Sequence, residues 1–155
     1  RPTTDAPPPK AASEPLAGPS PAALDVRGFG AAVVVLPLGA TKKRPVLIAA
    51  HGNYDRPEWQ CQVWGEVVRG RAFVLCPRGV PRRDSPSPSD PRFEYASNEA
   101  LEREVDAGVE ALRARHPEHV DDGPLLWAGF SLGAIQGAVT PEGMGETPRS
   151  CTRTM

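Results

Sequence analysis

One short segment constrains the fold of this chain more than any other. The apolar run 125–130, LLWAGF, leads into a serine that stands between two glycines, Gly129-Phe130-Ser131-Leu132-Gly133, and a small, helix-compatible stretch follows. A serine directly after a buried strand, with glycines two places before and after it, is typical of a sharp strand-to-helix turn with closely packed backbone. The segment therefore predicts a strand, a strained turn at Ser131 and a helix.

Three further apolar runs predict the rest of a sheet. They cover 31–38, 45–50 and 71–76. The last two, like 125–130, are apolar without alternation, which favours strands covered on both faces, as in a parallel sheet. Pro37 in the first run predicts that this strand either lies at an edge of the sheet or ends near Pro37.

Two helical patterns lie between these runs. Segment 98–115 has an apolar stripe with acidic residues early and basic residues late, which suits the helix dipole. Segment 57–68 predicts a second helix, whose apolar face is expected to contain Trp59, Val63, Trp64, Val67 and Val68. Both tryptophans are expected to pack in the core, and the alternative is that they line or flank the substrate pocket. The order of strands and helices predicts an α/β fold with a mostly parallel sheet and flanking helices.

Composition bounds the organisation of the chain. Its 155 residues predict one domain, and a net charge of -1 gives no field that would attract nucleic acid. No apolar run is long enough to span a membrane. Seven prolines in 1–23 predict a disordered linker in this segment. The folded domain is expected over 24–139, and an irregular tail over 140–155. Such a linker is compatible with a secreted or periplasmic protein whose signal is not visible, and equally with a cytoplasmic one.

The turn at Ser131 matches the G-x-S-x-G nucleophile elbow, with Gly129 and Gly133 as its glycines. Acyl transfer by such a serine needs two N–H donors for the oxyanion of the tetrahedral intermediate. The Leu132 N–H is the expected first donor. Asn53, which follows His51-Gly52 after run 45–50, is the expected second donor. His51 and Gly52 are expected to brace this loop, and the alternative for His51 is a role as catalytic base.

Two segments, AAHGNYD at 49–55 and GFSLGA at 129–134, resemble the α/β-hydrolase superfamily. The similarity is to phospholipase/carboxylesterase, dienelactone-hydrolase and polyester-depolymerase-like esterases, and it covers about 31–138, the N-terminal half of such a domain. The resemblance implies that Ser131 cleaves ester or thioester bonds of a small-molecule substrate through an acyl-enzyme. It implies no cofactor and no metal, and places an aspartate and then a histidine after the serine.

The sequence departs from this pattern after Ser131, because 132–155 contains no aspartate and no histidine. His116 and His119 precede the serine and are expected at the far end of the sheet. The tail lacks a helical or strand period, as a shifted reading frame or a truncated gene would produce, and loss of the frame at or just after Ala138 is the favoured interpretation. We therefore expect this chain to be inactive and to fold poorly alone. The alternative is a non-catalytic fragment or interaction module that keeps only the scaffold, and the oligomeric state stays open.

Two cysteines are expected near each other, at the carboxyl ends of neighbouring strands. Cys61 lies early in the first predicted helix and Cys76 closes run 71–76. If the protein is exported, they are expected to form a disulfide, and otherwise they remain two buried thiols. Cys151 is then left over. The long segment 77–96 between a strand and a helix is expected to be functional or disordered.

Overall fold

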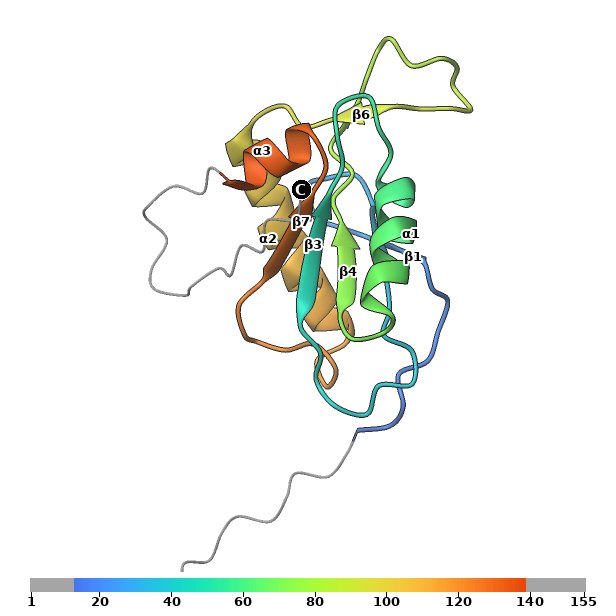
Figure 1. Cartoon of the computed structure of the whole chain (residues 1–155), viewed down its shortest axis with the longest axis vertical. Helices are drawn as coiled ribbons and strands as arrows, with labels where there is room; N and C mark the ends of the chain where they lie inside the picture. Colours follow the sequence, from blue (N-terminus) through green and yellow to red (C-terminus); the bar gives the residue numbers. More distant parts are fainter. Residues whose placement is uncertain (1–12, 139–155) are drawn as a thin grey trace, which may run out of the picture.

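A five-stranded sheet forms the centre of the molecule (Figure 1). The structure is a computed structural model that describes residues 13–138. The spatial order of the strands is β1 (Ala22–Leu24), β2 (Ala32–Val35), β4 (Phe73–Cys76), β3 (Val46–Ala50) and β7 (Leu126–Gly129). Strand β3 runs parallel to β4 and β7, whereas β2 is antiparallel to both of its neighbours. All four strands predicted from the apolar runs are present, and the α/β fold class is confirmed.

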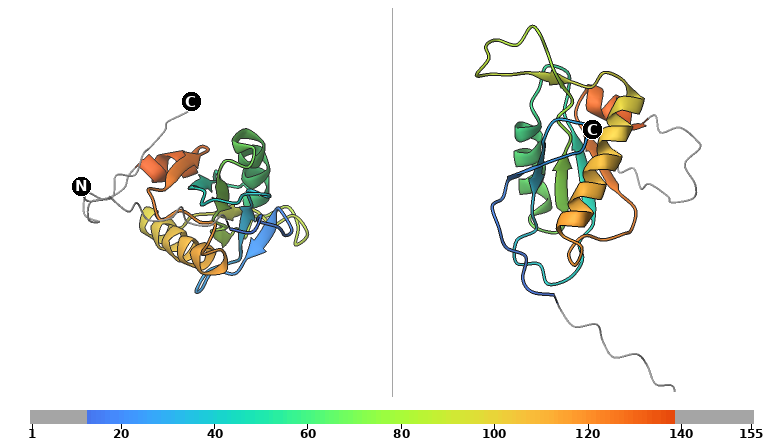
Figure 2. Two further views of the ribbon diagram at one scale, coloured as in Figure 1. Left: turned by 90° about the horizontal axis from the view of Figure 1, so that it is seen from below. Right: turned by 180° about the vertical axis from the view of Figure 1, so that it is seen from behind.

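Helices cover both faces of this sheet, with α1 (Pro57–Val68) on one side and α2 (Asn98–Arg115) on the other (Figure 2). Alternate side chains of each strand point to opposite faces. In β3, Ile48 joins the core cluster under α2, while Leu47 joins the cluster under α1. Because both faces are covered, both sets of side chains are apolar, which explains the uninterrupted apolar runs.

Both predicted helices have the bounds that the sequence indicated, and their first residues show why. Helix α1 begins at Pro57, whose missing N–H costs nothing in the first turn. Before α2, the Ser97 hydroxyl accepts a hydrogen bond from the Ala100 N–H at 3.1 Å. This N-cap satisfies one of the amides that the first turn leaves without a helical partner.

The predicted buried face of α1 is wrong for three of its five residues. Trp59, Val63 and Val67 are 45%, 53% and 54% exposed, and so Trp59 is not a core residue. The helix instead buries Cys61, with Trp64 and Val68 packed at the edge of the same cluster. The covalent link from Cys61 to β4 sets the rotation of the helix about its axis, and hydrophobic periodicity alone could not predict it.

The N-terminal boundary also needs correction. The predicted linker 1–23 is packed from residue 13 onward: Leu16 is buried, and Ala22–Leu24 forms β1 against β2. Strand β2 is therefore an internal strand that ends at Val35, so Pro37 marks the end of the strand, as one of the two predictions had it, and not an edge of the sheet. Residues 1–12 and the predicted tail 140–155 lie outside the described part of the chain.

The long segment between β4 and α2 is ordered. It contains a two-stranded ribbon of β5 (Val80–Pro81) and β6 (Phe93–Glu94), and the loop between these strands projects beyond the sheet (Figure 1). The last described element, α3 (Leu132–Ala138), follows β7 and contacts β7, β3 and α2. Between residues 13 and 138, no helix combines the length and apolar character that a membrane crossing requires.

Candidate active site

Ser131 occupies a strained turn between β7 and α3. Its φ angle is 51°, in the left-handed region that residues with a side chain rarely adopt, and its side chain is exposed. Two close approaches require the flanking glycines. A Cβ on Gly129 would lie 2.6 Å from the Ala134 nitrogen, and one on Gly133 would lie 2.5 Å from the Ala50 carbonyl oxygen. The sequence thus forces the chain to reverse with the serine at its apex.

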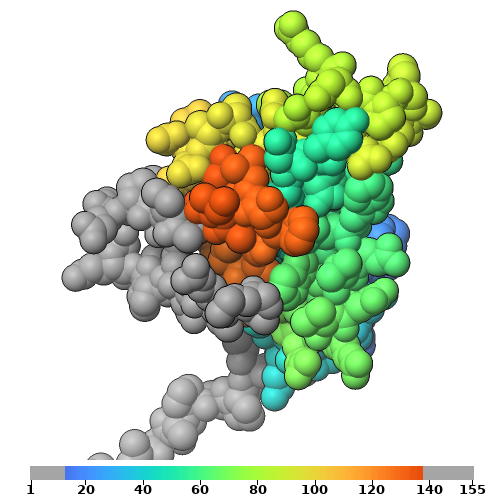
Figure 3. Space-filling view, turned by 45° about the horizontal axis from the view of Figure 1, so that its top comes forward, coloured from blue at the N-terminus to red at the C-terminus, as the bar shows by residue number. Residues whose placement is uncertain are grey.

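The loop after β3 packs directly against this turn. The Phe130 N–H donates to the Ala50 carbonyl at 3.1 Å. A Cβ on Gly52 would lie 3.2 Å from the Phe130 ring and 3.4 Å from the Ser131 Cβ, so the two segments are in contact. Figure 3 shows this neighbourhood on the surface, with the elbow and α3 in orange beside the teal-green residues that follow β3.

Two backbone amides beside Ser131 are available to a ligand. Neither the Leu132 N–H nor the Asn53 N–H donates a hydrogen bond to another residue between 13 and 138. Leu132 is half-buried and Asn53 is exposed, and two amides without a protein acceptor on touching segments are suited to donate to an oxyanion. The structure therefore places the two predicted donors on the two segments that meet at the serine.

His51 is completely buried and does not face an open site. Its Nδ1 lies 2.7 Å from the Gly52 carbonyl oxygen and its Nε2 lies 2.8 Å from that of Arg78. The ring stacks on Tyr95, with 4.4 Å between the centroids. With both nitrogens engaged by backbone carbonyls, His51 connects the loop after β3 to the loop after β4 and is not free to take a proton from Ser131.

Tyr95 and Glu104 complete this network, and the sequence analysis did not identify either residue. The Tyr95 hydroxyl donates to the Pro77 carbonyl at 3.0 Å and accepts from the His51 N–H at 3.1 Å. Its burial raises the pKa of the phenol well above its usual value, so it remains a donor.

The Glu104 carboxylate is 4% exposed and accepts the N–H groups of Arg78 and Gly79 at 2.8 and 3.0 Å. Burial raises the pKa of this carboxyl, although both hydrogen bonds oppose the rise. An acidic residue beside the apolar stripe of α2 was the signal that could have identified it. A cavity of about 540 Å³ adjoins Glu104 on the α2 side, and neither Ser131 nor Asn53 lines it.

Asp55 holds the other end of the loop after β3. Its carboxylate accepts the Gly52 N–H at 3.3 Å, the Arg56 N–H at 2.7 Å and the Gln60 side-chain amide at 3.2 Å. The Phe93 N–H donates to the Asp55 carbonyl at 3.0 Å, which ties the loop to β6. The loop that carries Asn53 is therefore fixed from both the α1 side and the β6 side.

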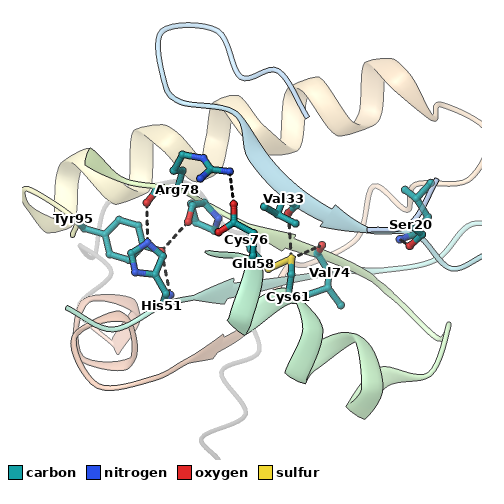
Figure 4. Close-up of a disulfide and its surroundings, with 11 residues drawn as sticks. Ser20, Val33, His51, Glu58, Cys61, Val74, Cys76, Arg78 and Tyr95 are labelled. Atoms are coloured by element: carbon teal, nitrogen blue, oxygen red, sulfur yellow. Dashed lines mark hydrogen bonds and ion pairs between the residues drawn. A yellow bond between two sulfur atoms is a disulfide. The ribbon is translucent and has the colours of Figure 1, made fainter. Parts of the chain in front are cut away.

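A disulfide between Cys61 and Cys76 joins α1 to β4 (Figure 4). Cys61 and Cys76 are both fully buried, with their Cα atoms 5.9 Å apart. Cys76 immediately precedes Pro77 and Arg78, whose carbonyl groups contact Tyr95 and His51. The crosslink therefore anchors the strand end on which the buried network depends.

The remaining histidines lie far from Ser131 along the strand direction. The Arg44 N–H, just before β3, donates to the His119 carbonyl at 2.7 Å, and His116 stacks at a tilt on Phe73, the first residue of β4. Both therefore lie at the amino ends of the parallel strands, while Ser131 follows a carboxyl end. Among residues 13–138 no histidine is in a position to activate Ser131, and no cluster of three or more potential ligands could hold a metal ion.

Comparisons with known proteins found similarity only among solved structures. No protein-family model matches the chain, and no curated protein matches it. TT1662 from Thermus thermophilus aligns with 22% identity and a TM-score of 0.46, covering 75% of this chain and 48% of its own. A Bacillus cereus carboxylesterase aligns with 23% identity and a TM-score of 0.42, covering 72% of this chain and 53% of its own.

A CE1 ferulic acid esterase from Anaeromyces mucronatus, in complex with ferulic acid, aligns with 16% identity and a TM-score of 0.43, over 74% of this chain and 52% of its own. The chain spans about half the length of these structures. Independently of them, the parallel strands, the helices on both faces and the strained serine turn form the partial α/β-hydrolase fold that the sequence predicts.

Proposed function

We propose that this chain carries the nucleophile and the oxyanion hole of a serine esterase that acts on small-molecule esters or thioesters. The observation that carries the proposal is the strained conformation of Ser131, with φ of 51° enforced between two obligatory glycines. Strain of this kind costs roughly 1–3 kcal/mol and persists mainly where function requires it. The free amides of Leu132 and Asn53 on the adjoining segments support the same role.

In the proposed reaction a base removes the Ser131 hydroxyl proton while Oγ bonds to the substrate carbonyl carbon. The carbonyl oxygen becomes an oxyanion that accepts hydrogen bonds from the Leu132 and Asn53 N–H groups. Collapse of the intermediate expels the alcohol or thiol, which takes up the proton. Water then cleaves the acyl-enzyme by the same steps and releases the acid.

No histidine among residues 13–138 is placed to act as this base. All three histidines of the chain have other positions, His51 in the buried network and His116 and His119 at the opposite end of the sheet. Without a base the Ser131 hydroxyl is a weak nucleophile. We therefore propose that the chain by itself turns over esters only at a residual rate that its oxyanion hole allows.

Added imidazole can test this assignment by replacing the missing base. The full chain is incubated with a fluorophosphonate, which bonds to serine oxygen and releases fluoride, and labelled peptides are identified by mass spectrometry. We expect imidazole to accelerate labelling of Ser131 at least tenfold, because the base is the missing component. Ser131→Ala is the control and should give no imidazole-dependent label. Labelling of Ser131 no faster than that of exposed serines, such as Ser89, would contradict the proposal.

A second candidate, a non-catalytic interaction module, is favoured by one observation. Strand β7 pairs with β3 on one side and has no neighbour on the other within the described sheet. Unpaired strand edges bind other strands. The labelling assay separates the two proposals, because a scaffold that only binds partners would leave Ser131 unreactive with or without imidazole.

We also propose that the protein works in an oxidising compartment, outside the cell or in a periplasm. The disulfide between α1 and β4 supports this location, because disulfides persist in such compartments and are rare in the cytoplasm. Alkylation of free thiols in protein recovered from its native cells tests the proposal. Modification of Cys61 or Cys76 under denaturing conditions without reductant would instead indicate a cytoplasmic protein.

A further inference from the structure

An arginine from the segment after β4 holds the turn that carries the proposed oxyanion donor. Arg82 Nη1 donates to the Asn53 side-chain oxygen at 2.6 Å. The same guanidinium donates to both oxygens of Asp84 at 2.8 and 2.9 Å and to Glu94. Its side chain is only 21% exposed. Arg82 is thus fixed by two carboxylates and in turn fixes Asn53.

The turn needs such support because of its backbone. Tyr54 has a φ angle of 61°, a second left-handed residue directly beside the proposed donor. Its ring lies 5.6 Å from the Arg82 guanidinium and 5.3 Å from that of Arg92, and its hydroxyl donates to the Asp84 carbonyl at 3.0 Å. The Asn53 N–H has no acceptor among residues 13–138. Its peptide plane is held from one side, because the Gly52 carbonyl oxygen lies 2.7 Å from His51 Nδ1, and the Arg82 bond to the Asn53 side chain holds the residue from the other side.

Charge balance indicates what Arg82 contributes. Asp84 and Glu94 together carry two negative charges against the single positive charge of Arg82. The hydrogen bond to Arg82 lowers the pKa of Asp84, and that to Asp84 raises the pKa of Arg82, so the pair stays charged around neutral pH. The guanidinium therefore adds no net positive charge beside an oxyanion, and its contribution is to orient the turn.

We propose that Arg82 is a positioning residue that aims the Asn53 N–H at the oxyanion of the reaction at Ser131. The inference rests on the proposed function for its catalytic meaning. Its structural part is that the direction of the Asn53 N–H depends on the Arg82 guanidinium, and this part does not rest on the proposed function. Arg83, the next residue, is exposed and has no side-chain partner in the described structure, so it provides a matched control.

The structural part is tested by ¹⁵N relaxation of the full chain. We expect the order parameter of the Asn53 N–H to be near 0.85 in the wild type and to fall below about 0.6 in Arg82→Gln. Asn53→Ala removes only the acceptor of the Arg82 bond and should loosen residue 53 in the same way. Arg83→Gln should match the wild type. An Asn53 amide that stays rigid in Arg82→Gln, or in Asn53→Ala if the first variant does not fold, overturns the proposal.

The catalytic part is tested by imidazole-supported labelling of Ser131 at varied probe concentration. We expect Arg82→Gln to lower the maximal labelling rate about tenfold, less than loss of a whole oxyanion donor, with the half-saturating probe concentration unchanged. Arg82→Lys keeps the charge but cannot bridge Asp84 and Asn53 together, so it should not restore the rate. Full recovery by lysine would overturn the proposal, because charge would then suffice.

The two proposals fail in distinguishable ways. If imidazole does not support labelling of Ser131 in the wild type, the esterase assignment falls, while the order parameters still decide whether Arg82 orients Asn53. If labelling occurs but is equal in Arg82→Gln, Arg83→Gln and the wild type, the esterase assignment stands and the positioning role is wrong.

Discussion

At the scale of single residues, the candidate site depends on backbone conformations that its side chains do not favour. Ser131 and Tyr54 both have positive φ angles, of 51° and 61°, and they lie on the two segments that meet at the site. Contacts around them compensate for this strain. Gly129 and Gly133 allow the close approaches at Ser131, and Arg82 and Arg92 enclose the ring of Tyr54.

Replacing Ser131 by glycine should stabilise the protein. Glycine adopts a φ of 51° without steric cost, so we expect Ser131→Gly to raise the free energy of unfolding by about 1 kcal/mol while abolishing labelling. Ser131→Ala keeps the strain and loses the hydroxyl, so it should abolish labelling without raising the free energy of unfolding. Chemical denaturation of the two variants measures the difference. Equal stability of the glycine and alanine variants would show that the turn is not strained.

Adding one methyl group at Gly133 should be costly. Its Cβ would lie 2.5 Å from the Ala50 carbonyl oxygen, a backbone atom that cannot move without shifting β3. We expect Gly133→Ala to lower the free energy of unfolding by about 3 kcal/mol. Gly123→Ala is the control, because its nearest neighbour would be a side-chain oxygen at 3.4 Å. The elbow geometry is refuted if both alanine variants unfold at the same denaturant concentration.

At the scale of secondary-structure elements, α1 and α2 support the site from opposite faces of the sheet. Helix α1 is tied to β4 through Cys61 and Cys76. Helix α2 sends Glu104 to the backbone just beyond the end of β4. Both elements therefore act on the same strand end, from which Arg78 contacts His51.

The burial of Glu104 should make stability depend on pH in an unusual direction. Because burial raises its pKa above the ordinary 4.5, the folded protein holds this proton more tightly than the unfolded chain. The free energy of unfolding should therefore fall as pH rises from 4.5 to the folded-state pKa. The stability of the wild type relative to Glu104→Gln should decline over this range, measured by urea denaturation between pH 4 and 7.

A matched carboxyl on the same helix controls for general effects of charge. Glu110 is exposed, and Glu110→Gln should leave the slope of stability against pH as in the wild type. A wild-type stability that rises relative to Glu104→Gln above pH 4.5 would mean that the hydrogen bonds from Arg78 and Gly79 outweigh burial.

The crosslink between α1 and β4 should account for much of the stability of the domain. The two cysteines are 15 residues apart, and closing a loop of this length stabilises a fold by about 3 kcal/mol. In a Cys151→Ser background, we expect a reductant to lower the free energy of unfolding by this amount. The further replacement of Cys61 and Cys76 by serine should remove the response to reductant. A melting temperature indifferent to reductant in the two-cysteine protein would contradict this expectation.

At the scale of the whole molecule, helices cover both faces of the described sheet, and β7 is one of its two edge strands. Strand β7 has β3 as its one partner within the described residues. Near it, Phe130 and Ile135 are 61% and 65% exposed. Open strand edges beside apolar surface promote association of chains.

We therefore expect the chain to self-associate through this side of the sheet. Ile135→Lys should weaken association about tenfold, because a lysine in the contact would be desolvated. Val63→Lys changes another exposed apolar residue, on α1 and away from β7, and should have no effect. Sedimentation velocity over a range of concentrations measures both. A wild-type chain that stays monomeric at about 100 µM would contradict the prediction.

The sequence by itself determined the elements and the elbow, because these depend on neighbours along the chain. Apolar runs without alternation indicated the strands β3, β4 and β7, and helical periodicity indicated α1 and α2. The glycines around Ser131 indicated the strained turn, since only glycine permits such close backbone contacts. The strand-end positions of Cys61 and Cys76 predicted that these residues lie within bridging distance.

Only the tertiary structure decided how the elements meet. The rotation of α1 follows from its crosslink to β4, and periodicity placed three exposed residues on its buried face. Glu104 reaches Arg78 across 26 positions of the sequence, and Arg82 reaches Asn53 across 29. Local propensity carries no information about such pairs, because the partners become neighbours only when the strands align. The support of the proposed oxyanion hole is therefore a property of the folded sheet and its loops.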